Sequence, residues 1–352
     1  MARKPHVDEG APAGGRVRLV APDAPEDAAG ADVLGLRPTR LGDFVGQTEL
    51  KGRLSVYVEA ALRRGDALDH VLLHGPPGLG KTTLARILAA EMGVAIHETS
   101  GPAIEHKGML AGLLTGLGEG DVLFIDEIHR LSPAVEESLY AAMEDGRIDL
   151  PVGEGSRART MQFTLPRFTL VAATTRTALL TAPLRERFPI VEELTFYADD
   201  ELAEVAARTA ARLGCPATED GALEIGRRSR GTPRVTNNLV RRIRDFVEVD
   251  EGTRIDRAAA DRGLSALGID RAGLDEADRR ILRCILEQFG GGPVGIDAIA
   301  ATLSMPRDTL EDVYEPFLLQ RGFLVRTPRG RRAQPKAAEH LGLEGPGQPR
   351  LL

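Results

Sequence analysis

The spacing of apolar residues along the chain alternates between two periods. Between residues 48 and 64, Leu50, Leu54, Val58 and Leu62 recur every four positions, which predicts a helix with one buried face. Short apolar runs, as at 71–74 and 122–125, instead predict strands that are buried on both faces. We expect strands at 71–74, 94–98, 122–125 and 168–174, and helices at 48–64, from Lys81 onward, at 109–117 and at 134–143. Strands that alternate with helices in this way indicate an α/β domain with a parallel sheet.

Changes in this pattern divide the chain into units. Residues 1–33 are rich in Ala, Pro, Gly and Asp and show no periodicity, so we expect a disordered leader. Only helical spacing is found from Asp199 to about Leu267, which predicts a small helical domain. The expected units are the leader at 1–33, a large α/β domain at 34–197, the helical domain at 198–268, a third domain at 270–342 and a tail at 343–352.

Three helices and a hairpin are predicted in the third domain. A helical stripe is formed by Ile281, Leu282, Ile285, Leu286 and Phe289. Further helices are expected near 296–303 and 309–320, and a strand at 322–326 leads into a turn at 327–330. Three helices followed by a short hairpin are typical of a winged helix.

A β-hairpin at about 148–165 interrupts the α/β pattern. Apolar residues alternate with other types in both arms, at Ile148, Leu150 and Val152 and again at Met161, Phe163 and Leu165. Two arms of period two around a glycine-containing loop predict a hairpin. It either packs on its own domain or presents apolar surface near its tip to a partner.

A phosphate-binding loop follows the first predicted strand. Residues 75–83 read Gly-Pro-Pro-Gly-Leu-Gly-Lys-Thr-Thr, which is a complete G-x-x-x-x-G-K-T pattern between a strand and a helix. Backbone N–H groups of such a loop surround a polyphosphate, and the start of the next helix faces the same charge. We expect Lys81 to reach the β- and γ-phosphates and Thr82 to ligate Mg²⁺.

Two acids end the strand at 122–125. Asp126 is placed to meet Mg²⁺ opposite Thr82, and Glu127 is placed to polarise the attacking water. Together with the phosphate loop, this pair predicts hydrolysis of ATP and not only nucleotide binding.

Polar residues also end the strand at 168–174. The hydroxyl of Thr174 or Thr175 could hold the attacking water beside the γ-phosphate. Further along, Arg185 and Arg187 could be surface residues in ion pairs. One of them could also be an arginine finger that reaches into the site of a neighbouring subunit.

Composition limits the other possibilities. The longest apolar stretches are too short to cross a bilayer, so we expect no membrane span and a cytoplasmic location. Cys215 and Cys284 are too few for a disulfide framework or a metal site.

The net charge of −7 argues against a general nucleic-acid coat, but the third domain has a local excess of positive charge. Its cations are Arg321, Arg326, Arg329, Arg331, Arg332 and Lys336, with no acid between them in the sequence. On a wing, such a run favours contact with DNA phosphates.

The chain resembles the RuvB family, the AAA+ motors of bacterial Holliday-junction branch migration. The resemblance covers about residues 36–342 and rests on five motifs in the order and spacing of the family. These are the phosphate loop at 75–83, Phe-Ile-Asp-Glu-Ile-His-Arg-Leu-Ser at 124–132, Ala-Thr-Thr-Arg at 173–176, Arg-Gly-Thr-Pro-Arg at 230–234 and Arg-Thr-Pro-Arg-Gly-Arg at 326–331.

The resemblance implies roles for individual residues. Catalytic roles are implied for Lys81, Asp126, Glu127, Thr174 or Thr175, Arg187 as the finger and Arg234 as the second sensor. Nucleotide contacts are implied for Leu36, Arg37, Gly78, Lys81, Thr82, Thr83, Glu144, Asp145, Gly146, Arg187, Tyr197 and Arg234. The metal ligands would be Thr82 and Asp126, and the DNA contacts Arg307, Arg326 and Arg331. Gly146 stands where the family often has an aromatic residue.

The resemblance also implies an activity and partners. It implies a homohexameric ring that uses ATP and Mg²⁺ to move double-stranded DNA at Holliday junctions, with no membrane partner. A RuvA-type protein would dock on the 148–165 hairpin, and a RuvC-type resolvase would act with the complex indirectly. A clamp loader-type ATPase, or a DNA-binding scaffold without motor activity, remains the alternative.

Overall fold

The computed structural model describes residues 37–152 and 159–343. A five-stranded parallel sheet forms the centre of the first domain, with the strand order β2-β3-β6-β1-β7. Its strands are β1 (Val71–His74), β2 (Ile96–Ser100), β3 (Val122–Asp126), β6 (Thr169–Thr174) and β7 (Ile190–Glu193). The side chains of β3 and β6 are almost fully buried, as expected for strands covered on both faces.

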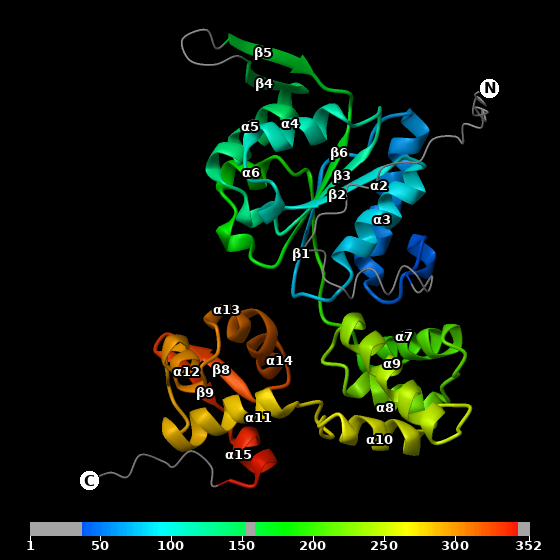
Figure 1. Ribbon diagram of the computed structural model, residues 1–352, viewed down its shortest axis with the longest axis vertical. Helices are drawn as coiled ribbons and strands as arrows, with labels where there is room; N and C mark the ends of the chain where they lie inside the picture. The colour runs from blue at the N-terminus through cyan, green and yellow to red at the C-terminus, as the bar shows by residue number, and fades with distance from the viewer. Residues whose placement is uncertain (1–36, 153–158, 344–352) are drawn as a thin grey trace, which may run out of the picture.

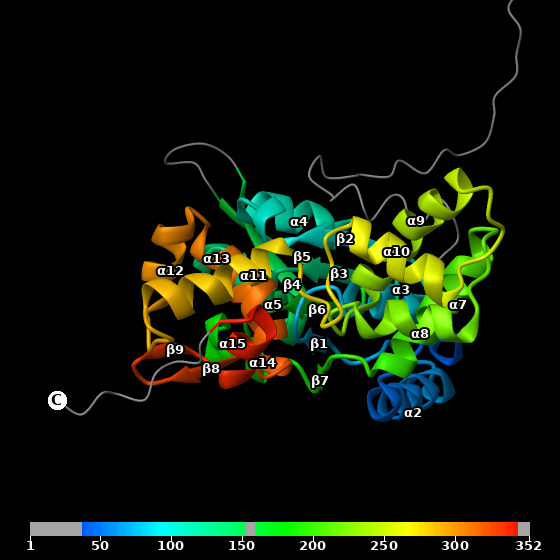
Figure 2. The same cartoon turned by 90° about the horizontal axis from the view of Figure 1, so that it is seen from below.

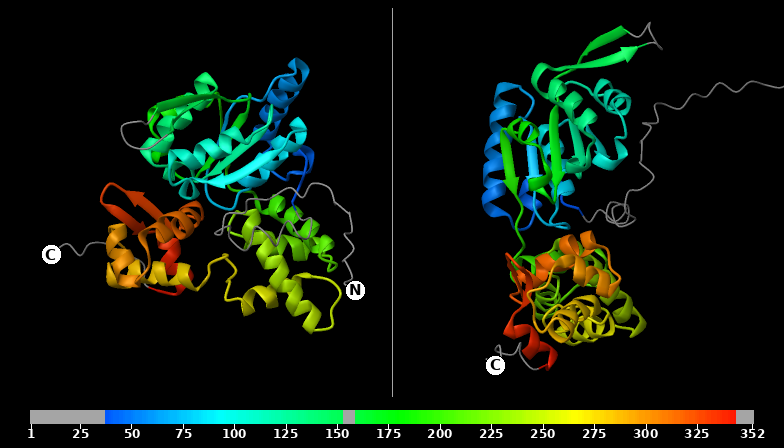
Figure 3. Two further views of the ribbon diagram at one scale, coloured as in Figure 1. Left: turned by 45° about the horizontal axis from the view of Figure 1, so that its top comes forward. Right: turned by 90° about the vertical axis from the view of Figure 1, so that its left-hand side faces the viewer.

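Helices cover both faces of this sheet (Figures 1 and 3). One face packs on the core of α2 (Thr48–Arg64) and α3 (Lys81–Met92), where Leu54 and Leu84 are fully buried. The other face packs on α4 (Lys107–Thr115), α5 (Pro133–Asp145) and α6 (Ala182–Glu186). Short 3-10 turns complete the domain at η1 (Leu41–Asp43), η2 (Gly101–Ala103), η3 (Ile128–Arg130) and η5 (Thr177–Leu179).

A separate hairpin projects from this domain (Figure 1). It consists of the antiparallel strands β4 (Arg147–Val152) and β5 (Arg159–Thr164). At its base Ile148 is buried in the domain core, whereas Met161, further out, is 48% exposed. Met161 is therefore an exposed apolar side chain on the part of the hairpin beyond its buried base.

The second domain consists of helices, as the sequence predicts. They are α7 (Asp199–Arg212), α8 (Glu219–Arg227), α9 (Pro233–Val249) and α10 (Arg257–Ala266). Their buried faces share one core that includes Ala206, Ile225, Val240 and Leu264.

The third domain is a winged helix. It lies beside the second domain (Figures 1 and 2). Its helices are α11 (Glu276–Arg283), the π-helical η6 (Cys284–Gln288), α12 (Ile296–Leu303), α13 (Arg307–Thr309), the π-helical η7 (Leu310–Tyr314), α14 (Glu315–Gln320) and α15 (Pro335–Leu341). The wing is the antiparallel pair β8 (Leu324–Thr327) and β9 (Gly330–Ala333).

The predicted fold class is confirmed, with differences in detail. Strand β2 begins two residues later than the expected 94–98, and α6, β7 and α15 were not predicted. The predicted leader, most of the predicted tail, the hairpin tip and Leu36 lie outside the described residues. In the part of the chain that the structure describes, no helix is both long and apolar enough to cross a membrane.

Candidate active site

The carboxyl ends of three adjacent strands meet at one edge of the sheet. Strand β6 lies between β1 and β3, and its Thr174 is in register with His74 at the end of β1. The loop after β1 begins at Gly75, whose N–H donates to the carbonyl of Thr174 at 3.3 Å. Strand β3 ends at Asp126 on the same edge. The fold thus brings together the phosphate loop, the two acids and the threonines at 174–175.

The backbone conformation of the loop requires glycine. Gly75, Gly78 and Gly80 all have positive φ angles, of 135°, 81° and 103°. A Cβ atom on Gly75 would lie 2.3 Å from the carbonyl oxygen of Leu194, which leaves no space for a side chain. Helix α3 begins directly after the loop, so its N-terminal N–H groups face the loop interior.

Lys81 lies inside this loop. Its Nζ donates to the carbonyl oxygens of Gly75 and Pro76 at 2.8 and 2.9 Å, and the residue is 8% exposed. Burial lowers the pKa of Lys81 to about 8, although nearby Asp126 opposes the shift. A polyphosphate in the loop would favour the charged ammonium, so Lys81 is suited to bind the phosphates of a nucleotide. Thr82 and Thr83 follow in the first turn of α3, where both are half-buried.

The two acids lie in different environments. Burial raises the pKa of Asp126, whose Oδ1 accepts the N–H of Glu127 at 2.8 Å. Glu127 has a left-handed backbone, with φ of 48°, and its Oε2 pairs with Arg130 at 3.0 Å. A left-handed non-glycine residue costs about 1–3 kcal/mol and is most common where function needs a side chain in a particular direction.

The same edge offers a place for a divalent cation. Among the described residues, no cluster of three or more His, Cys, Asp or Glu could hold a metal alone. A Mg²⁺ ion beside Asp126 and Thr82 would therefore take its remaining ligands from phosphate oxygens and water. This sharing is the usual arrangement for Mg²⁺ at nucleotide sites.

The two candidate threonines differ in their availability. Thr174 is 1% exposed, and its Oγ1 accepts the N–H of Arg176 at 3.0 Å and lies 2.9 Å from Nδ1 of His129. Burial lowers the pKa of His129, which favours its neutral form. Because Thr174 is engaged by its own chain on two sides, the half-buried Thr175 is better placed to meet a ligand.

The second domain contacts the phosphate loop. The N–H of Arg234, in the first turn of α9, donates to the carbonyl of Gly78 at 3.3 Å. Tyr197 donates its hydroxyl to the carbonyl of Leu79 at 3.2 Å, and its own N–H donates to Gly231 at 3.0 Å. Tyr197 and Arg234 therefore lie at the loop, for which the resemblance implies nucleotide contacts.

A second group of predicted residues gathers at the end of α5. Arg187 pairs with Glu144 at 2.9 Å, donates to the carbonyl of Pro183 at 2.7 Å and lies 4.6 Å above the ring of Tyr140. Asp145 and Gly146 follow directly at the end of α5. The structure thus groups Glu144, Asp145 and Gly146 with Arg187, a grouping that the sequence alone does not indicate. Arg37 is half-buried at the start of the described chain.

The predicted DNA-binding arginines are paired with acids on helices of the same domain. Arg326 and Arg331 donate to both oxygens of Glu315, at 2.7–3.1 Å, and Glu315 is 3% exposed. Arg307 pairs with Asp297 and Glu311. The positive run on the wing is therefore less strongly charged than the linear sequence indicates. The side chain of Arg326 is 55% exposed, whereas that of Arg331 is only 16% exposed.

Sequence reasoning missed several residues of the site. His129 and Arg130 contact the predicted residues Thr174 and Glu127. Both belong to the motif at 124–132, so their place in that motif was the available signal. Glu315 gave no comparable signal, because it lies outside the wing motif, eleven residues before Arg326, to which it is paired.

The sheet order, the phosphate loop, the acid pair and the helical domain at the loop define an AAA+ ATPase that carries a winged helix. Comparison with family models narrows this class. The model for the Holliday junction DNA helicase RuvB P-loop domain matches residues 36–194, the RuvB AAA lid domain matches 197–270 and the RuvB C-terminal winged helix domain matches 271–342. The chain therefore belongs to the RuvB family.

Individual proteins give the same result. The Holliday junction branch migration complex subunits RuvB of Anaeromyxobacter sp. (strain K) and Anaeromyxobacter dehalogenans (strain 2CP-C) are each 58% identical to this chain over 312 residues. The match covers 89% of this chain and 91% of each relative. The structure of the Thermotoga maritima RuvB Holliday junction branch migration motor is similar with a TM-score of 0.81 at 50% identity. An alanine-to-serine mutant of that protein gives 0.83, and both cover 88% of this chain and 99% of their own.

Proposed function

We propose that this ATPase is a translocase on double-stranded DNA that drives branch migration of Holliday junctions. The observation that carries the proposal is the presence, in one chain, of the candidate ATPase site and a winged helix. The two are joined by ion pairs of Arg176, which directly follows the threonines at 174–175, with Asp308 and Asp312 of the winged helix. The RuvB relatives are named as subunits of a branch migration complex, which supports the same reaction. A clamp loader-type ATPase shares the nucleotide motifs, but it does not account for a basic wing.

Within the site, each residue has a proposed part. Lys81 and the N–H groups of the loop hold the phosphates, and Arg234 reports the bound nucleotide to the helical domain. Thr82 and Asp126 hold Mg²⁺, which when bound neutralises charge on the phosphate oxygens. Glu127 accepts a proton from the attacking water, and Thr175 orients that water.

Arg187, Glu144, Asp145 and Gly146 are proposed to act at the site of the next subunit in a homohexameric ring. The ion pair that joins Arg187 to Glu144 at the end of α5 supports a shared role for these residues. A guanidinium supplied by a neighbour stabilises charge that develops during phosphoryl transfer. Hydrolysis would then depend on ring assembly.

We further propose that a RuvA-type junction-binding protein docks on the β4–β5 hairpin, and that a RuvC-type resolvase joins the complex through it. The exposed apolar face around Met161 supports this docking. Contacts to phosphates carry little sequence information, so recognition of the junction would come from the partner.

The proposed reaction is tested with a synthetic four-way DNA junction and ATP. The wild-type chain with a RuvA-type partner is expected to move the branch point. Glu127→Gln is expected to bind ATP but to lose turnover by about 100-fold or more, because the proton acceptor is removed. Lys81→Ala should lose nucleotide binding itself. The exposed acid Glu119, changed to Gln, serves as the control, and near-normal hydrolysis by Glu127→Gln would contradict the assignment.

The trans role of Arg187 predicts complementation between two inactive variants. Arg187→Ala and Lys81→Ala subunits should each lack ATPase activity when alone. In rings mixed at equal amounts, roughly a quarter of the interfaces would combine an intact loop with an intact finger. ATPase activity of the mixture should recover toward that fraction. If native mass spectrometry shows mixed rings without recovery, Arg187 acts within its own subunit.

The ion pairs on the wing predict unequal effects of its arginines. Arg326→Gln should lower the salt slope of duplex binding by about one unit, because one phosphate contact is lost. Its melting temperature should stay near wild type, since Arg331 still pairs with Glu315. Replacing both arginines should also lower the melting temperature, because Glu315 is then buried without a cation. Arg63→Gln on α2 is the control, and an unchanged slope for Arg326→Gln would place the DNA surface elsewhere.

The hairpin predicts a partner-specific defect. Met161→Asp should abolish pull-down of a RuvA-type partner and partner-stimulated branch migration, because an unpaired charge would be buried in the complex. Basal ATPase and melting temperature should be retained, since Met161 is exposed in the free chain. Thr164→Asp, on the opposite face of β5 beside Arg147, is the matched control. Partner binding by Met161→Asp would contradict the docking site.

A further inference from the structure

Arg176 links the nucleotide site to the winged helix directly. Its Nε and Nη2 donate to the two carboxylate oxygens of Asp312 at 3.0 and 2.7 Å, and Nη2 also donates to Asp308 at 2.9 Å. In its own domain, the N–H of Arg176 donates to Thr174 at the end of β6. The same short segment therefore ends the central strand beside the phosphates and holds the DNA-binding domain.

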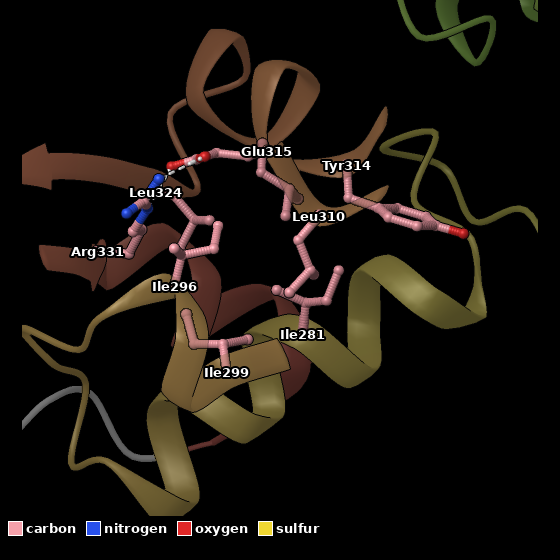
Figure 4. A pocket seen from close by; sticks show the side chains of 9 residues that line it. Ile281, Ile296, Ile299, Leu310, Tyr314, Glu315, Leu324 and Arg331 are labelled. Atoms are coloured by element: carbon pink, nitrogen blue, oxygen red, sulfur yellow. Dashed lines mark hydrogen bonds and ion pairs between the residues drawn. The ribbon is translucent and has the colours of Figure 1, made fainter. Parts of the chain in front are cut away.

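The acids on this side of the winged helix are arranged in two rows. Asp308 and Asp312 are four residues apart, which places them on one side of the helical stretch 307–320 (α13, η7 and α14). Glu311 and Glu315 form a second row of the same spacing. Arg331 bonds to Glu311 at 3.1 Å and to Glu315 at 2.8 Å (Figure 4 shows the second pair), and Arg326 bonds to Glu315. One row faces the ATPase domain and the other faces the wing.

A third contact connects the helical domain to the same stretch. Arg230 donates to the carbonyl of Val313 at 3.3 Å and lies 5.4 Å from the ring of Tyr314. It also binds Asp278 of α11 with both terminal nitrogens. Arg230 lies four residues before Arg234, whose N–H donates to Gly78 in the phosphate loop. The segment after β6 and the segment at 230–234 both lie at the candidate nucleotide site, and both contact residues 308–314.

The geometry of these contacts is suited to transmit movement. A two-bond pair between a guanidinium and a carboxylate fixes orientation as well as distance, which a single charge contact does not. The side chains of Arg176 and Asp312 are 27% and 33% exposed, so solvent screens this pair less than a surface pair. By contrast, Asp308 is 75% exposed, and its contact is expected to contribute little alone.

We propose that residues 307–320 form a coupling helix between the nucleotide site and the DNA wing. When the end of β6 moves, Arg176 moves Asp312 with it. The other row, Glu311 and Glu315, moves with the same helix and changes how strongly it pairs with Arg331 and Arg326. Those pairs determine how available the two arginines are to DNA phosphates. Because coupling between two binding sites is reciprocal, DNA on the wing also changes the position of Arg176. The proposal rests on the proposed function, since it assigns a route between its two activities.

The test removes the carboxylates on the ATPase-facing row and leaves both sites intact. In the full chain, Asp308→Asn and Asp312→Asn are combined, and ATPase activity is measured with and without duplex DNA. Basal activity should stay within about two-fold of wild type, whereas the ratio of DNA-stimulated to basal activity should fall about five-fold or more. The ratio of duplex Kd values measured with ADP and with a non-hydrolysable ATP analogue should approach one.

Two further variants control for structural effects. Asp312→Glu alone keeps the charge, and we expect it to retain most of the coupling. Asp245→Asn removes a carboxylate from ion pairs with Arg242 and Arg244 inside the helical domain, and we expect it to leave both ratios unchanged. Melting temperatures show which variants are folded at the assay temperature.

The outcomes separate this proposal from the proposed function. If duplex DNA neither binds to nor stimulates the wild-type chain, the translocase function itself fails. If the wild-type chain is stimulated and the double variant keeps both ratios, with or without a lower melting temperature, the coupling helix is wrong while the function stands. The coupling helix is supported if the folded double variant shows both expected falls, in DNA stimulation and in the ratio of Kd values. Asp312→Glu should then keep most of the coupling, and Asp245→Asn should leave both ratios unchanged.

Discussion

The position of β6 between β1 and β3 is the constraint on which the rest of the structure depends. Parallel strands present their carboxyl ends at one edge, so this order places the phosphate loop, Asp126 and the threonines together without long-range side-chain pairing. The same order makes the end of β6 central to the site. The segment that continues directly from β6 carries Arg176, whose N–H donates to Thr174 at the end of that strand.

The charges of the winged helix follow from a second constraint, which is that buried acids require cations. Glu315 is 3% exposed, and its pKa is lowered by the guanidinium hydrogen bonds of Arg326 and Arg331, although burial opposes this shift. The carboxylate is thus kept ionised, and the two arginines are held in fixed directions. DNA would meet cations that are already oriented but partly neutralised.

The sequence predicts the parts of this protein that local pattern determines. Helix α2 and strand β1 have the expected bounds, because their apolar spacing is unambiguous. Strand β7 was missed, since it contains two glutamates and has only four residues. Glu192 is nevertheless 3% exposed. Its buried charge is paired with Arg53, which lies 139 residues away in the sequence. The grouping of Arg187 with Glu144, and of Glu315 with the wing, likewise depends on tertiary contacts that no linear pattern records.

Backbone strain occurs at one residue of the candidate active site and at one residue that contacts the winged helix. Glu127 and Arg230 both have a left-handed backbone, with φ of 48° and 55°, at a cost of about 1–3 kcal/mol each. Glycine would relieve that cost but would remove a carboxylate from the phosphate edge in one case and a guanidinium from Asp278 in the other. The packed surroundings of Arg230 maintain its conformation, since its side chain also lies 4.7 Å from the ring of Phe317. At these two residues, the contacts of the side chain accompany a backbone conformation that local preference disfavours.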